Sequence, residues 1–272
     1  MTRPLSPYQR GLQHFNGTLF CPDSASAGGR GLGGVWTTGA GVTVTHATPA
    51  SELDTQQRRT IYSNSGGGGT NDQELGVRQT AAGDYAYWMG NYNRLGGWYF
   101  STIFRLEAWN NNAGRFFAGL SASANAIVAS DTVPQNTIGL WHDTTDGADA
   151  TWIVIRGTGA VDKTHAVTTN ALNPGLWATG ATFIWEMWEA PFGISVTNTS
   201  YRLSWFETTH TKPDKPSVKL VEMNSIGGGP ATNTFCAPQV QMSNGADTTA
   251  GHFSIGIANI YVTPHTGELD ID

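Results

Sequence analysis

The stretch that decides the fold is GGWYFSTIFRLEAWNNNAGRFFAGLSAS, residues 96–123. Its first half alternates strictly, since Trp98, Phe100, Phe104 and Leu106 fall on one side of an extended chain and polar residues fall mostly on the other. A period of two is the signature of a strand with one buried face. The Asn/Gly run at 110–114 favours a turn, and the apolar run after it indicates a returning strand. We therefore predict an aromatic-rich β-hairpin here.

The same pattern extends along most of the chain. Twelve segments read as strands, and no segment shows a convincing amphipathic helix. The strand segments fall near residues 35–46, 58–64, 74–80, 84–90, 96–107, 115–122, 136–143, 150–157, 181–190, 199–208, 217–223 and 252–264. Short strands at this spacing, joined by Gly, Asn and Asp, are typical of a two-sheet sandwich. The fold prediction is all-β: a single antiparallel β-sandwich of jelly-roll or concanavalin-like type, with an extended N-terminal arm.

Three regions follow from composition. Residues 1–34 are rich in Pro, Gly and Ser but keep several apolar side chains, which favours an attachment arm that becomes ordered on a particle or on another subunit; a simply disordered tail is the alternative. Residues 35–264 form the predicted sandwich, and residues 265–272 an exposed acidic tail. Cys21 and Cys236 leave two alternatives open, namely two free thiols or one bridge.

Composition and charge exclude several classes of function. The 272 residues carry a net charge of −6, with 15 Lys and Arg against 21 Asp and Glu, which argues against nucleic acid as a partner. The sequence contains no run of eighteen apolar residues, so no membrane insertion is predicted. The N-terminus lacks the apolar core of a signal peptide, so we expect synthesis in a cytoplasm. The glycine runs lack the Lys-Ser/Thr of a phosphate loop, so no cofactor is predicted.

No catalytic or metal site emerges from the residues. Glu186 and Glu189 are three positions apart, so a regular strand would place them on opposite faces, which is unsuitable for a glycosidase pair. The loop with Asp143, Asp146 and Asp149 could supply oxygen ligands to calcium, although Asp with Gly is also what a hairpin turn requires. The histidines form no zinc motif. We predict a protein that is not an enzyme and holds no resident metal.

The tryptophans fall into two groups by their position in the strand pattern. Trp98, Trp185 and Trp205, with Phe100, are predicted to lie in the core. The others sit at strand ends or on the opposite face, and are candidates for exposure, for subunit contacts or for stacking on sugars: Trp36, Trp88, Trp109, Trp141, Trp177 and Trp188.

Two loops place a Trp beside short hydrogen-bonding side chains at a strand end, where binding residues commonly lie. They form the predicted glycan-binding site, with ordinary hairpin turns as the alternative. The site comprises Trp109, Asn110, Asn111 and Asn112 of the first loop and Trp141, His142, Asp143, Asp146 and Asp149 of the second.

Six segments together resemble a β-sandwich domain of tailed-bacteriophage virion proteins, often found at the tip of tail fibres. They are QQRRTIYSN, YAYWMGNYNRLGGWYFSTIFRLE, GRFFAGLSAS, TIGLWHDTTDGADATWIVI, FIWEMWEAPFGISVTNTSYRLSW and HFSIGIANIYVTP, between about Val44 and Pro264. The resemblance implies a jelly-roll or concanavalin-like sandwich, a location on the virion, other virion proteins as partners and a homotrimer. It offers no catalytic residues.

The chain differs from a complete tail fibre because it has no long stalk. Two roles are therefore expected: an accessory structural subunit attached to the capsid or tail, or alternatively a receptor-binding module for glycans of the host surface.

Overall fold

A computed structural model describes most of the predicted strands. The residues that it describes are 18–21, 30–32, 38–46, 59–64, 72–79, 87–88, 98–110, 114–123, 127–129, 132–144, 150–156, 162–166, 177, 179–189, 199–206, 221–224, 234–247, 249 and 251–264. Their regular structure is almost entirely strand, with one 3₁₀ turn, η2 (Ile127–Ala129). Among these residues no helix is long and apolar enough to cross a membrane.

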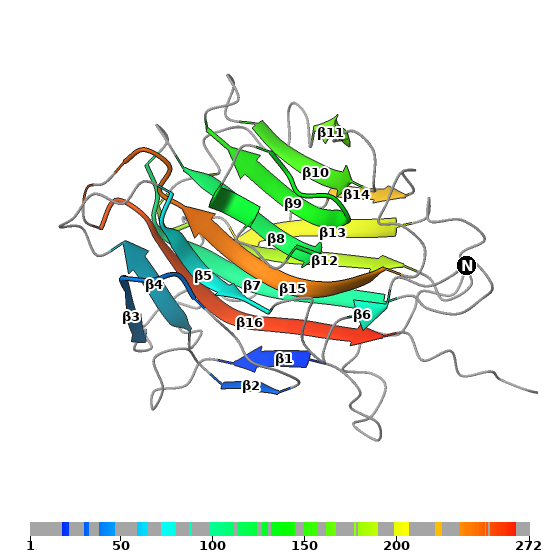
Figure 1. Ribbon diagram of the computed structural model, residues 1–272, viewed down its shortest axis with the longest axis horizontal. Coiled ribbons are helices and arrows are strands. Elements are labelled where there is room, and N and C mark those ends of the chain that lie inside the picture. The colour runs from blue at the N-terminus through cyan, green and yellow to red at the C-terminus, as the bar shows by residue number, and fades with distance from the viewer. Residues whose placement is uncertain are drawn as a thin grey trace, which may run out of the picture.

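The strands form two antiparallel sheets, and the predicted sandwich is confirmed (Figure 1). The nine-stranded sheet has the order β14 (Val221–Asn224), β13 (Thr199–Phe206), β12 (Thr182–Glu189), β7 (Trp98–Ala108), β16 (Ser254–Pro264), β1 (Thr18–Cys21), β2 (Arg30–Leu32); β4 (Thr60–Asn64) also pairs with β16, and β3 (Val42–His46) pairs with β4. The seven-stranded sheet has the order β11 (Asp162–Ala166), β10 (Ala150–Arg156), β9 (Thr137–Asp143), β8 (Arg115–Ser121), β15 (Phe235–Ser243), β5 (Glu74–Arg78), with β6 (Tyr87–Trp88) also on β15.

The core lies between the sheets, as the period of two predicts. Trp98, Phe100 and Trp185 are at most 1% exposed, which confirms them as core residues. Across the interface, the Phe104 ring of β7 stacks on the Phe116 ring of β8 with centroids 4.4 Å apart. The side chain of Trp205 lies outside the described residues.

That contact corrects the predicted hairpin. β7 pairs with β12 and β16, whereas β8 pairs with β15 and β9, so the two strands belong to opposite sheets. The connection after Trp109 therefore crosses from one sheet to the other. Both strands carry an apolar face, and in a two-sheet sandwich these faces pack against each other across the core. By contrast, β9 pairs with β10 and β12 pairs with β13, so these consecutive strands do lie side by side in one sheet.

β15 was not predicted, yet it is an interior strand of its sheet, between β8 and β5. Its segment FCAPQVQMS combines Pro238 with two glutamines, and both features suggest a loop. Pro238 is tolerated because β6 pairs with β15 at Phe235 and Cys236 and β5 takes over from Gln239 onward. Cys236 is a free thiol, fully buried, and burial raises its pKa to about 12.

The predicted boundary at residue 34 also needs correction. β1 and β2 belong to the expected arm, but β1 pairs with β16 and β2 pairs with β1, so both extend the nine-stranded sheet. In Figure 1 they lie, in blue, beside the red β16. The remaining arm segments 1–17, 22–29 and 33–34, and the predicted tail 265–272, lie outside the described residues.

The outer face of the seven-stranded sheet carries a second, smaller core. Phe117 and Trp141 point to this side and pack with Ile127, Val128 and Val133, which belong to the segment around η2. Gly119 and Gly139 face each other beneath the Phe117 ring, and a Cβ on either would come within 2.9 Å of that ring. The absence of a side chain at these glycines therefore leaves room for the Phe117 ring against the sheet.

Candidate functional site

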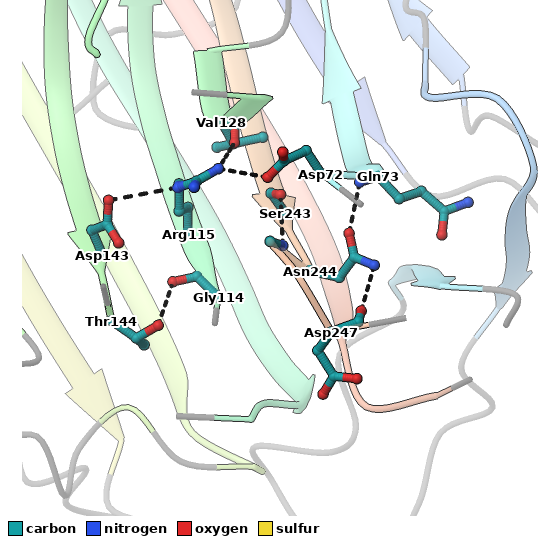
Figure 2. A network of polar contacts seen from close by, with 11 residues as sticks. Asp72, Gln73, Gly114, Arg115, Val128, Asp143, Thr144, Ser243, Asn244 and Asp247 are labelled. Atoms are coloured by element: carbon teal, nitrogen blue, oxygen red, sulfur yellow. Dashed lines mark hydrogen bonds and ion pairs between the residues drawn. The ribbon is translucent and has the colours of Figure 1, made fainter. Parts of the chain in front are cut away.

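The two predicted loops do meet at one end of the sandwich. The Gly114 carbonyl, at the end of the first loop, accepts hydrogen bonds from the Thr144 N–H at 3.1 Å and from the Thr144 hydroxyl at 3.2 Å. Figure 2 shows this contact beside Arg115 and Asp143. Asn111, Asn112, Asp146 and Asp149 lie outside the described residues.

The tryptophans of these loops are not exposed, and the prediction that they could be is wrong. Trp109 is 8% exposed and Trp141 is fully buried. The Trp109 ring packs against Trp177 at 5.7 Å and edge-on against Phe253 at 5.6 Å, on the core side. Trp177, also a candidate for exposure, is 1% exposed. Each indole gains more by burial than by facing water, and no other described residue of these loops supplies an exposed aromatic ring.

His142 belongs to the same aromatic cluster. Its imidazole lies parallel to the Trp177 ring, with centroids 4.2 Å apart and an angle of 9°, and its ring centroid lies 5.3 Å from that of Trp109. The side chain is fully buried, and this burial lowers the pKa of His142 to about 3. The imidazole is therefore neutral at physiological pH and acts as a flat packing element.

Asp143 is also buried, and it belongs to an ionic network centred on Arg115. The Arg115 Nε lies 3.6 Å from Asp143 Oδ2, while Nη1 donates to Asp72 Oδ1 at 2.6 Å and to the Val128 carbonyl at 3.3 Å (Figure 2). One guanidinium thus connects β8, β9, η2 and Asp72, which lies two residues before β5. Among the described residues, no group of three or more His, Cys, Asp or Glu could hold a metal ion.

Asn110 takes part in a second polar network at this end. Its amide donates to Asp247 Oδ2 at 2.6 Å, and the His252 ring nitrogen lies 2.9 Å from the same oxygen. Asn244 accepts from the Gln73 N–H and donates to the Asp247 carbonyl, both at 2.6 Å. These contacts hold the loops together. The described residues of the predicted site therefore stabilise this end of the sandwich.

A different surface combines aromatic rings with a carboxylate. It is the outer face of the nine-stranded sheet, where the alternation of β7, β12 and β16 brings five half-buried side chains together on three adjacent strands. We call this set the outer patch: Tyr99, Ser101, Glu186, Trp188 and Tyr261.

The register of the three strands arranges the outer patch in two rows. Tyr99 of β7 stands opposite Trp188 of β12, whereas Ser101 stands between Glu186 of β12 and Tyr261 of β16. Diagonal neighbours on a sheet face are about 7–8 Å apart, which is within reach of long side chains. The Tyr99 hydroxyl donates to Glu186 Oε1 at 2.5 Å, and its ring centroid lies 6.1 Å from that of Tyr261. Ser101 is small enough to leave room for this diagonal arrangement.

Part of the outer patch could be predicted from the sequence. The alternation in residues 98–107 assigns Tyr99 and Ser101 to the outer face, and Trp188 was among the candidates for stacking on sugars. Strand alternation does not show which strands are neighbours, so Glu186 and Tyr261 could not be grouped with them from the sequence.

No protein-family model and no curated protein matches this chain by sequence. Solved structures do match by fold. One is a protein of unknown function from Shewanella oneidensis MR-1, with 12% identity over 96% of this chain and 95% of that one, and a TM-score of 0.53. Another is the PL-14 alginate lyase from Aplysia kurodai, with 10% identity, 90% and 97% coverage, and a TM-score of 0.51. At these identities the likeness shows the shared β-sandwich fold alone.

Proposed function

We propose that this chain is a glycan-binding β-sandwich, and that it serves a tailed-bacteriophage particle as a receptor-binding module rather than as an enzyme. The observation that carries the proposal is the outer patch, in which the Tyr99, Trp188 and Tyr261 rings adjoin the Glu186 carboxylate on a rigid sheet face. The virion location comes from the resemblance of the sequence.

The chemistry of the outer patch suits a sugar ring. A pyranose has an apolar face of C–H groups, which packs on aromatic rings, and a polar edge of hydroxyls, which hydrogen bonds to carboxylates. The Tyr99 and Tyr261 rings are tilted by 58° with centroids 6.1 Å apart, so they contact each other and leave no space for a ligand between them. A cage for a quaternary ammonium needs rings set apart around the cation, whereas this surface favours a flat ligand lying on top.

The β-sandwich fold is compatible with glycan binding. The alginate lyase that shares the sandwich acts on a carbohydrate, as its name states, but function depends on the site rather than on the fold. The proposal therefore depends on the outer patch, and the patch is where it can be tested.

The test is binding to an array of oligosaccharides, followed by calorimetry with the best ligand. Replacing Trp188 or Tyr261 by Ala should weaken binding by at least about tenfold, the usual loss on truncating a central aromatic anchor. Phe235→Ala is the matched control, because Phe235 is 55% exposed on the other sheet and its loss should leave affinity unchanged. The bound oligosaccharide should be recovered chemically intact.

The competing occupant of the outer patch is another subunit. Light scattering on the same variants separates the two cases. If Trp188→Ala and Tyr261→Ala dissociate an oligomer while the unmodified protein binds no glycan on the array, the face is a subunit interface and the glycan proposal is contradicted.

The virion location has a separate test. We expect purified phage particles to contain this chain, as a homotrimer in contact with other virion proteins, and we expect residues 1–16 to attach it. Deleting these residues, which precede β1, should leave the sheet pairing of β1 intact and remove the protein from the particle. Mass spectrometry of purified particles measures this, and normal incorporation of the truncated chain would contradict the attachment role.

A further inference from the structure

We propose that this face of the nine-stranded sheet recognises glycans that carry an acetamido group, and that Asn259, Ile103 and Ile184 bind this group. The inference rests on the proposed function, since it names the class of glycan bound at the same face. It concerns a row of side chains next to the outer patch, whereas the proposed function concerns the aromatic rings of the patch.

The three residues form a third cross-strand row, which continues the two rows of the outer patch. Ile184 of β12 stands opposite Ile103 of β7, and Ile103 stands opposite Asn259 of β16. All three residues are half-buried. The row lies two residues along the strands from the row that contains Tyr261, and two residues of an antiparallel strand span about 6.8 Å. A sugar ring on the outer patch can therefore place a ring substituent on this third row.

A β-bulge in β16 gives Asn259 its position. The register of β16 on β7 shifts between Ile257 and Asn259. Ile257 and Ile260 are both fully buried in the core although they are three residues apart, so the outer side accommodates one extra residue between them. The Asn259 Oδ1 accepts a hydrogen bond from the Ile103 N–H at 3.2 Å, which ties the bulge to β7. Bulges commonly redirect a side chain beside a functional site.

This hydrogen bond fixes the orientation of the Asn259 amide. Because the Ile103 N–H is a donor, its partner must be the amide oxygen, so the Nδ2 of Asn259 points elsewhere. Within the part of the chain that the structure describes, this Nδ2 has no hydrogen-bond partner. The side chain thus presents two N–H donors in a fixed position, two residues from Tyr261 on the same strand.

An acetamido group has the features that this row complements. Its carbonyl oxygen accepts hydrogen bonds, and its methyl group is apolar. The Asn259 amide supplies the donors, and the adjoining Ile103 and Ile184 side chains supply apolar surface for the methyl group. A hydroxyl group at the same position of the sugar has no methyl group to bury, so the apolar surface of the two isoleucines stays in water. The row therefore favours N-acetylated amino sugars over simple hexoses.

The experiment compares matched pairs of oligosaccharides that differ in whether they carry an acetamido group or a hydroxyl group. The pairs are chitotriose with cellotriose, and N-acetyllactosamine with lactose. We expect the unmodified protein to bind the acetamido member of the better-bound pair about tenfold more tightly, which is the combined effect of one hydrogen bond and one buried methyl group. Calorimetry measures the affinities.

Two variants separate the donor from the apolar surface. Asn259→Asp removes the N–H donors and keeps an acceptor for the Ile103 N–H, so the bulge should persist and the preference should fall close to one. Ile184→Thr keeps a β-branched side chain with less apolar surface, and it should weaken binding of the acetamido member alone, by roughly threefold. Gln135→Glu is the matched control, because it makes the same change from amide to carboxylate at an exposed position next to the other sheet. It should leave the preference unaltered, and unfolding midpoints show whether each variant folds.

The outcomes separate this inference from the proposed function. Equal binding of both members of every pair by the unmodified protein, or a preference that Asn259→Asp leaves unchanged, overturns the acetamido inference and leaves glycan binding in place. Binding confined to glycans without an acetamido group has the same meaning. Absence of binding to any oligosaccharide overturns both.

Discussion

Replacing Trp177 by Ala should lower the free energy of unfolding by about 3–5 kcal/mol, the usual cost of removing a fully buried large aromatic side chain. Trp177 is 1% exposed and lies at the centre of the aromatic cluster. Its ring stacks on His142 at 4.2 Å and on Phe183 at 5.0 Å, and it packs on Phe116 at 5.3 Å. Truncation would leave a cavity lined by residues of both sheets, which rigid strands cannot close.

The measurement is equilibrium unfolding in denaturant, with the midpoint and the slope fitted separately. Trp188→Ala is the matched control, because this indole is half-buried on the outer face and its loss should cost well under half as much. Equal losses for the two variants would show that Trp177 does not hold the two sheets together as the structure indicates.

Acid should destabilise the protein through His142. Burial lowers the pKa of His142 from 6.5 to about 3, so below pH 6.5 the unfolded chain takes up a proton that the folded protein does not. The free energy of unfolding is therefore unaffected by His142 above pH 6.5 and falls as the pH drops toward 3. The slope for one such group is about 1.4 kcal/mol per pH unit, so the loss should reach a few kcal/mol, on the order of 3, at pH 4.5.

His142→Phe isolates this contribution, because a phenyl ring keeps the stacking on Trp177 and does not titrate. Between pH 6.5 and 4.5 the variant should lose much less stability than the unmodified protein. The pKa of Asp247 is lowered chiefly by the Thr249 N–H, so Asp247 changes the free energy of unfolding only below this pH range. Burial raises the pKa of Glu74, although Arg78 opposes the rise, so protonation of Glu74 favours the folded protein as the pH falls. This contribution is the same in both proteins. Parallel pH profiles for the two proteins would contradict the assignment to His142.

The sequence predicted the layers of this fold better than its connections. Period-two alternation was sufficient to assign Trp98, Phe100 and Trp185 to the core, because burial of one face is a local property of a strand. Pairing is not local. The turn chemistry at 110–114 suits a hairpin and a crossing between sheets equally well, and the difference depends on partners such as β12 and β15 that lie more than 70 residues away.

The candidate site shows the same limit of prediction from local sequence patterns. A Trp at a strand end can face water or turn into the core, and for Trp109 and Trp141 the buried alternative is the one observed. That outcome depends on residues distant in sequence, namely Trp177 and Phe253 for Trp109, and Val128 for Trp141. The outer patch likewise exists only because the register aligns β12, β7 and β16.

The pairing of β16 has a consequence for how the protein is made. Its first half pairs with β4 and its second half with β1, while β7 lines its other edge along the whole length. In the second sheet β15 likewise separates β8 from β5. Both of these interior strands thus come later in the sequence than the strands that they join, so earlier strands must wait for partners still to be synthesised. We expect productive folding to begin only once β16 has been synthesised, with high contact order, slow closure and a need for chaperones that shield the waiting strand edges.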